Sequence, residues 1–141
     1  MSSKLYRKYT GHAERRRPQK KVLIIDEAGF SRICSAILET EGYRADIVTD
    51  ISAFSALLGG NRFGLVITSY PYGIQVFEQI KKLGIPTIIL SDHINRDLID
   101  ILERFGNSYC MIKPLDYAKF KYLVNEVFEN GKFAENGFNI L

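Results

Sequence analysis

The sequence predicts an α/β domain built on a single open parallel sheet, with helices covering both of its faces. Three observations lead to this prediction. Short apolar runs rich in β-branched residues alternate with longer segments whose apolar residues recur at helical spacing. The alternation occurs five times, and strands that alternate with helices pair in parallel through right-handed crossovers. A length of 141 residues is the usual size of one domain.

The first elements follow a polar N-terminal segment. Residues 22–25 form an apolar run that is typical of a strand buried on both faces. Apolar residues then recur at helical spacing over residues 30–38, and Gly42 ends this predicted helix. Residues 45–48 predict the second strand. The next helix, residues 54–58, stops at two consecutive glycines.

The middle of the chain repeats the pattern. Residues 65–67 predict the third strand, and residues 74–80 predict a short third helix that ends near a glycine. Residues 87–90 predict the fourth strand. The fourth helix covers residues 98–105 and ends at the following glycine.

The last elements are a strand and a capped helix. Residues 109–112 predict the fifth strand. Asp116 is the predicted N-cap of the fifth helix, whose apolar residues extend to Phe128 and which ends at Gly131. The segment after this glycine is expected to fray.

Charge divides the chain into a basic arm and an acidic body. Residues 1–21 carry eight basic residues against one acid, a net charge of +7, so the other 120 residues sum to −4. Because residues 1–19 are polar and lack a sustained apolar period, they predict a flexible N-terminal arm. Residues 20–131 are then the folded domain, and residues 132–141 are a C-terminal tail.

Composition excludes several classes of protein. No apolar run approaches the roughly 18 residues that span a bilayer, and no apolar segment of signal-peptide type is present, so we expect a cytoplasmic protein with no membrane partner. Cys34 and Cys110 lie in apolar surroundings, which favours two reduced, buried thiols over a disulfide. The sequence contains no CxxC pair that would predict a zinc site. It contains no Ser/His/Asp arrangement that would predict an enzyme.

Polar residues follow four of the five predicted strands. They are Asp26 and Glu27, Ser69, Ser91, and Lys113, in strand order. In an open parallel sheet the functional site lies outside the carboxyl ends of the strands, so these side chains are expected to share one pocket. Two carboxylates facing a lysine suit a hard cation and a phosphoryl group. The alternative is that polar residues merely mark the places where strands meet solvent.

The spacing of these residues resembles the receiver domain of two-component response regulators, over roughly residues 20–131. An acidic pair follows the run Val-Leu-Ile-Ile, Lys113 stands 22 residues after Ser91, and Gly106 stands seven residues before Lys113. The resemblance implies a three-layer sandwich of flavodoxin-like topology, with strand order 2-1-3-4-5.

The resemblance also implies roles for the pocket residues. In that family an acidic pair ligates Mg²⁺, an aspartate after the third strand accepts phosphate, a hydroxyl after the fourth strand senses it, and a lysine contacts it. Asp26 and Glu27 then take the metal role, Ser91 the switch role and Lys113 the phosphate-contacting role. The acceptor position holds Ser69. A serine hydroxyl is neutral and needs an adjacent general base, and none is evident in the sequence of this pocket.

Three further departures concern the same mechanism. The segment after Ser69 is about four residues shorter than is usual in the family and contains Pro71. The small residue that normally follows the switch hydroxyl is replaced by Asp92. The aromatic switch position holds Cys110, and Tyr109 stands one place earlier, where it should face the other side of the strand.

We therefore expect an atypical receiver, or pseudo-receiver, that acts by phosphorylation-independent protein–protein contact. The resemblance implies a protein partner such as a histidine kinase or an output domain. It also implies a homodimer through the face formed by the fourth helix, fifth strand and fifth helix. Tyr109, Tyr117 and Tyr122 belong to this face. They are candidate interface residues, and a role at the edge of the core is an equally good interpretation.

Two alternatives stay open. The first is a phosphorylatable response regulator of a phosphorelay that uses Ser69 or an adjacent acid. The second is nucleic-acid or anionic-surface binding through residues 4–21, whose charge would attract phosphates, although a solubilising linker is favoured. No cofactor is expected. Losing one of three carboxylates leaves at most weak Mg²⁺ binding, unless Asp92 turns inward and supplies the missing group.

Overall fold

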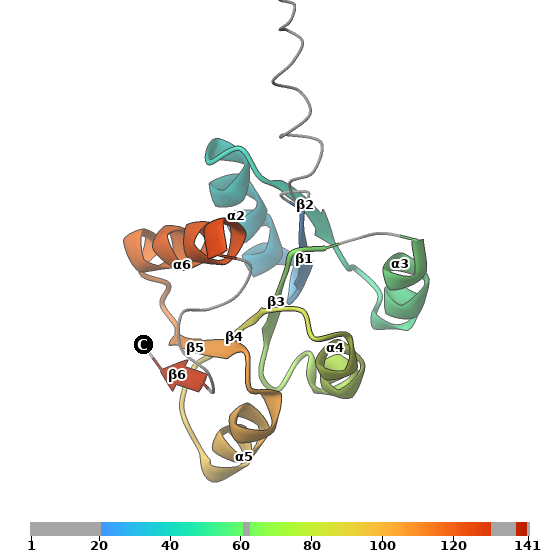
Figure 1. Cartoon of the computed structure of the whole chain (residues 1–141), viewed down its shortest axis with the longest axis vertical. Coiled ribbons are helices and arrows are strands. Elements are labelled where there is room, and N and C mark those ends of the chain that lie inside the picture. Colours follow the sequence, from blue (N-terminus) through green and yellow to red (C-terminus); the bar gives the residue numbers. More distant parts are fainter. Residues whose placement is uncertain (1–20, 61–62, 131–137, 141) are drawn as a thin grey trace, which may run out of the picture.

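The computed structural model describes residues 21–60, 63–130 and 138–140. Within them, six strands form one sheet in the order β2-β1-β3-β4-β5-β6, and all neighbouring strands are parallel (Figure 1). The strands are β1 (Lys21–Ile25), β2 (Arg44–Ile47), β3 (Leu65–Ser69), β4 (Thr87–Ser91), β5 (Ser108–Ile112) and β6 (Phe138–Ile140). The first five strands confirm the predicted class and order. The predicted basic arm lies outside the described residues.

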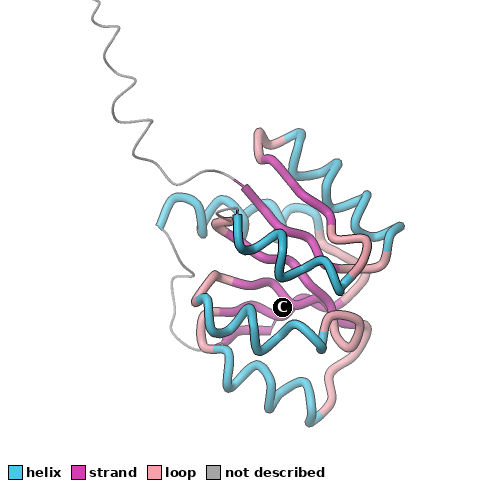
Figure 2. The backbone as a smooth tube through the Cα atoms, turned by 90° about the vertical axis from the view of Figure 1, so that its right-hand side faces the viewer, coloured by secondary structure: helices cyan, strands magenta, loops and turns pink. Residues whose placement is uncertain are grey.

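Helices cover both faces of the sheet (Figure 2). Among the described residues they are α2 (Ala28–Thr40), α3 (Phe54–Gly60), α4 (Phe77–Leu83), α5 (Arg96–Phe105) and α6 (Tyr117–Asn130). Short 3₁₀ helices, Ile51–Ala53 and Ile74–Val76, lead into α3 and α4. α2 and α6 lie on one face, and α3, α4 and α5 lie on the other (Figure 1). In the described ranges, no helix is long and apolar enough to cross a membrane.

Two apolar layers explain why the strands read as continuous apolar runs. Successive side chains of a strand point to opposite faces. Val22 and Ile24 of β1 pack in the layer under α2 and α6, whereas Leu23 and Ile25 pack in the layer under α3 and α4. Phe120 of α6 is fully buried in the first layer. Because both faces are covered, the four residues of β1 that follow Lys21 are all apolar and buried.

Capping residues set the starts of the last two helices. Asp116 accepts a hydrogen bond from the Lys119 backbone N–H at 3.1 Å, which confirms it as the N-cap of α6. Asn95 accepts one from the Leu98 N–H at 2.9 Å, so α5 begins two residues before its first predicted apolar position. Gly84 adopts a φ of +69° immediately after α4, a left-handed conformation that favours glycine.

The sixth strand corrects the expectation of a frayed C-terminal tail. β6 pairs in parallel with β5, with Phe138, Asn139 and Ile140 opposite Ser108, Tyr109 and Cys110. The sheet therefore extends one strand beyond the order 2-1-3-4-5, and β5 is an interior strand over these residues. Residues 138–140 are interrupted by Asn139 and so lack the continuous apolar run of residues 65–67, and they are too few to show an alternating pattern, which is why the sequence did not predict this strand.

Candidate functional site

Three of the predicted pocket residues meet where the strands end. Asp26 follows β1, Ser69 is the last residue of β3, and Lys113 follows β5. The Ser69 Oγ donates a hydrogen bond to Asp26 Oδ1 at 2.7 Å, and the Lys113 Nζ lies 3.6 Å from Asp26 Oδ2. Asp26 is 2% exposed and Ser69 is 3% exposed. The parallel sheet thus brings side chains 43 and 87 positions from Asp26 into contact with one buried carboxylate.

The Asp26 carboxylate is held by three groups of the chain itself. Oδ1 accepts from the Ser69 hydroxyl and also from the Glu27 backbone N–H at 2.7 Å. At 3.6 Å the contact between Oδ2 and Lys113 is an ion pair and not a hydrogen bond, so Oδ2 has no hydrogen-bond partner among the described residues. A buried charge needs such compensation, because isolated carboxylates are costly to desolvate.

Lys113 is held in place by an aromatic ring as well as by the carboxylate. Its Nζ lies 4.4 Å from the ring centroid of Phe30 on α2, within the range of a cation–π contact. The apolar stem of the lysine can pack along this ring while its charge reaches the pocket. This contact could not be predicted from the sequence, in which Phe30 is only one residue of an apolar helix face.

Among the described residues, the side chains of Glu27, Ser91 and Asp92 make no hydrogen bond or ion pair with the Asp26 carboxylate. The Ser91 hydroxyl donates to the His93 backbone carbonyl at 2.6 Å, so it is engaged by its own loop. Glu27 and Asp92 are exposed. Neither exposed carboxylate therefore joins Asp26 in a buried cluster.

The loop after Ser69 forms a tight turn. The Gly73 N–H donates to the Ser69 carbonyl at 2.8 Å, and the Ile74 N–H donates to the Pro71 carbonyl at 3.1 Å. A Cβ at Gly73 would stand 2.0 Å from Thr68 Oγ1, so no larger residue fits without rearrangement. The carbonyl oxygens of Ser69 and Pro71 thus accept hydrogen bonds within the turn.

The donor set fits a divalent cation poorly. Mg²⁺ demands near-octahedral oxygen ligands, usually including one or two carboxylates. Here one carboxylate is buried, its Oδ1 already accepts two hydrogen bonds, and an ammonium group stands beside its Oδ2. The described ranges hold no group of three or more His, Cys, Asp or Glu residues that could bind a metal ion. A second positive charge at Asp26 would be repelled by Lys113.

Cys34 on α2 is buried close to this pocket. Burial, and after it the nearby Asp26 charge, raise the pKa of its thiol to about 12, while the charge of Lys113 opposes the rise. Burial alone raises the pKa of Cys110 to about 11. Both cysteines are free. At neutral pH they are therefore neutral thiols, which are poor nucleophiles.

We expect both thiols to resist alkylation in the folded chain, because the thiolate is the reactive form. Iodoacetamide followed by intact-mass measurement should show no adduct under native conditions and two adducts in guanidinium chloride. Stability should also fall as the pH rises from the ordinary thiol pKa of 9.0 toward 12, because only the unfolded thiols then ionise. Rapid native modification of Cys34 would contradict the burial described here.

The three candidate interface tyrosines lie in different environments. Tyr117 and Tyr122 on α6 are 55% and 65% exposed. Tyr109 on β5 is half-buried and packs against the core layer under α2 and α6. The two interpretations therefore apply to different residues. Tyr109 lies at the edge of the core, whereas Tyr117 and Tyr122 are exposed on α6.

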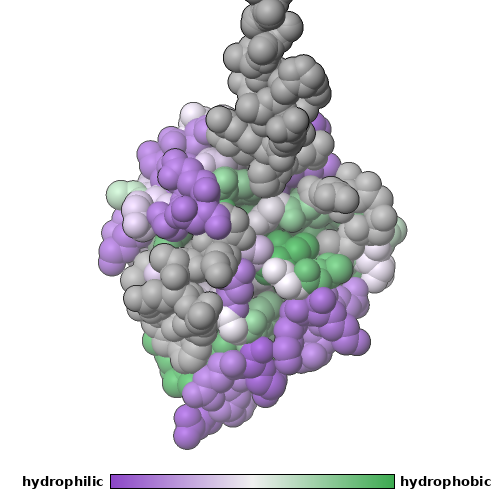
Figure 3. Space-filling model, viewed as in Figure 1, coloured by the Kyte–Doolittle hydropathy of each residue, from purple (hydrophilic) through white to green (hydrophobic). Residues whose placement is uncertain are grey.

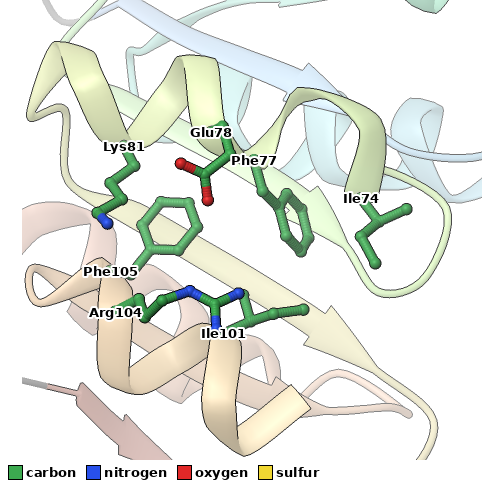
Figure 4. Close-up of a pocket in the computed structure, with 7 residues that line it drawn as sticks. All are labelled: Ile74, Phe77, Glu78, Lys81, Ile101, Arg104 and Phe105. Carbon is green, nitrogen blue, oxygen red and sulfur yellow. The ribbon is translucent and has the colours of Figure 1, made fainter. Parts of the chain in front are cut away.

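Two cavities lie away from Asp26. One, of about 220 Å³, lies between α4 and α5, with Phe77, Phe105 and Ile101 in its floor and the charged side chains of Lys81 and Arg104 beside them (Figure 4). Figure 3 shows hydrophilic residues gathered over α4 and α5 around this region. The other, of about 240 Å³, lies at the opposite end of the strands and is lined by residues that include Gly64, Pro86 and Phe128.

Comparison with known proteins bears on the fold. No protein-family profile matches the chain, and no curated protein matches it. Solved structures do match. A response regulator receiver domain protein (CheY-like) from Methanospirillum hungatei aligns with a TM-score of 0.69 at 20% identity, over 80% of this chain and 96% of that one.

Two further structures agree. A two-component response regulator from Clostridium difficile aligns with a TM-score of 0.71 at 19% identity, over 79% of this chain and 98% of that one. The beryllofluoride-activated NtrC4 receiver domain dimer aligns with a TM-score of 0.67 at 22% identity, over 80% of this chain and 99% of that one. This chain has the receiver-domain fold of two-component response regulators.

Proposed function

We propose that the chain is a pseudo-receiver, a signalling module that works by protein–protein contact without phosphorylation. The observation that carries the proposal is the hydrogen bond from Ser69 to Asp26. At the position where a receiver presents a carboxylate to a phosphodonor, this chain has an alcohol that donates its proton inward. The other polar contacts of the Asp26 carboxylate come from the Glu27 backbone N–H and the Lys113 ammonium of the same chain.

This network supports a single conformation that needs no ligand. A charge-assisted hydrogen bond is roughly twice as strong as a neutral one. The carboxylate has two such donors and a facing ammonium, which together offset its burial. The switch hydroxyl of Ser91 has its own partner in the His93 carbonyl. A phosphoryl group at Ser69 would have to break the hydrogen bond from Ser69 to Asp26. It would also have to draw the Ser91 hydroxyl away from the His93 carbonyl.

The contact surface of the proposed module includes α6. Tyr117 and Tyr122 are exposed there, and tyrosines are enriched at protein interfaces. The NtrC4 receiver domain, which has the same fold, was solved as a dimer. This similarity supports a protein, either a second copy of the chain or a different partner, as the binding partner. Two buried free thiols fit a reducing compartment such as the cytoplasm. We propose no catalytic activity and no cofactor.

One observation favours phosphorylation as a second candidate. Asp26 accepts the Ser69 proton and could act as the general base that the sequence did not reveal. The sequence does not indicate this role, because the family resemblance implies a metal-binding role for Asp26. The near-complete burial of Ser69 weighs against it, since a phosphodonor must reach the hydroxyl.

Backbone amide NMR shifts during titration with Mg²⁺ and beryllofluoride test the proposal. We expect flat shifts at Asp26, Ser69 and Lys113, because the carboxylate already has its partners. The NtrC4 receiver domain, which beryllofluoride activates, is the positive control. Saturable shifts at all three positions would support phosphorylation and contradict the pseudo-receiver proposal.

A further inference from the structure

The outer edge of β5 is covered by the chain's own β6. β5 pairs with β4 over five residues on one side and with β6 over three residues on the other. Without β6 it would be the edge strand of the sheet. An edge strand presents a row of unpaired backbone N–H and C=O groups, which is a template for pairing with another chain.

β6 and a strand from a second molecule cannot occupy this edge together. A symmetric pair of copies joined at β5 would place the two β5 strands antiparallel, each strand pairing with its equivalent. That pairing uses the same outward-facing backbone groups of Ser108–Cys110 that β6 now faces. The monomer with β6 in place and the β5-paired dimer are therefore alternatives.

The pairing of β6 is also the shortest in the described sheet. Its register covers three residue pairs, whereas the neighbouring pairing of β4 with β5 covers five. A short ladder has few hydrogen bonds to hold it, so it is the pairing most easily displaced. If β6 is displaced in two copies of the chain, two identical β5 edges are exposed. Each edge can then pair with the other, so no strand from a different protein is needed.

We propose that residues 138–140 are a built-in cap on the β5 edge, and that displacing the cap lets two copies of the chain pair through β5. The cap keeps the chain monomeric in its resting state. The homodimer expected at the face of α5, β5 and α6 is thereby gated by the position of β6. This inference does not rest on the chemistry of Asp26, so its failure would leave the pseudo-receiver proposal standing.

The test uses the full chain with Asn139 and Ile140 both replaced by proline. Successive backbone N–H groups of a strand alternate in direction, so one of the two prolines must remove a donor that faces β5. The control replaces the same two residues with alanine and keeps both N–H groups. A milder variant with glycine at both positions weakens the strand if the prolines unfold the chain, which circular dichroism would reveal. Light scattering after size-exclusion chromatography gives the mass across a concentration series.

We expect the unmodified chain and the alanine control to stay monomeric, and the proline variant to shift to a dimer as concentration rises. Hydrogen exchange at the amides of Ser108–Cys110 that face away from β4 should be fast in the dilute proline variant and slow again in its dimer. The glycine variant should dimerise less than the proline variant. A folded proline or glycine variant that stays monomeric at every concentration overturns the proposal. So does an unmodified chain that is already dimeric, or a dimer that leaves these amides unprotected.

Discussion

Replacing Lys113 with methionine should destabilise the folded chain by about 3 kcal/mol, near the lower end of the range for removing one partner of a buried ion pair. The methionine keeps an unbranched apolar stem beside Phe30 but leaves Asp26 Oδ2 with neither an ion pair nor a hydrogen bond. The effect falls at the lower end because Lys113 retains 21% exposure of its side chain. The midpoint of urea denaturation measures it.

Two controls separate the ion pair from general effects of losing a lysine. Lys121→Met removes a more exposed pair with Glu41 at 3.7 Å and should cost no more than about 1 kcal/mol. Combining Lys113→Met with Asp26→Asn removes both charges, so the double variant should be more stable than Lys113→Met alone. Equal losses from the Lys113 and Lys121 substitutions would show that Asp26 does not depend on its lysine.

Replacing Ser69 with aspartate should lower stability by about 3 kcal/mol in the absence of metal, because a charged hydrogen bond is lost and a like charge is added. The new carboxylate would stand where a hydroxyl now donates to Asp26 Oδ1 at 2.7 Å. Two adjacent carboxylates form a better Mg²⁺ site than one. At a Mg²⁺ concentration 100 times the dissociation constant, binding should restore about 2.7 kcal/mol.

Thermal unfolding with and without Mg²⁺ checks this result. The unmodified chain and the neutral control Ser69→Asn should show no rise in melting temperature, whereas Ser69→Asp should. The Ser69→Asp variant should still respond weakly to beryllofluoride, because the tight turn at Gly73 and the engaged Ser91 hydroxyl are unchanged. An equal response of the unmodified chain to Mg²⁺ would mean that a cation competes successfully with Lys113.

The meeting of Asp26, Ser69 and Lys113 could be predicted from the sequence, because a parallel sheet fixes where its strands end. What each side chain does there could not. The partner of Ser91 depends on the path of the loop to His93, and strand periodicity carries no information about loops. The roles expected for Asp26 came from a resemblance, which has no means of showing that Ser69 would donate to it.

The same distinction applies to the fold. The central strands β1, β3 and β4 could be predicted because they are buried on both faces and consist largely of apolar residues. β6 could not, because three residues carry no period and their pairing is decided by the tertiary edge that they meet. The contact of Lys113 with Phe30 likewise depends on tertiary structure, because the two residues lie far apart in the sequence.

Incubation with acetyl phosphate and Mg²⁺, followed by intact-mass measurement, tests the central claim most directly. The claim is that two hydrogen bonds and one ion pair from its own chain hold the Asp26 carboxylate, and that Ser69 is no phosphate acceptor. We predict an unchanged mass for the folded chain, with the NtrC4 receiver domain, which beryllofluoride activates, incubated alongside for comparison. A stable gain of one phosphate that maps to Ser69, or to an acidic side chain of the pocket, would contradict it.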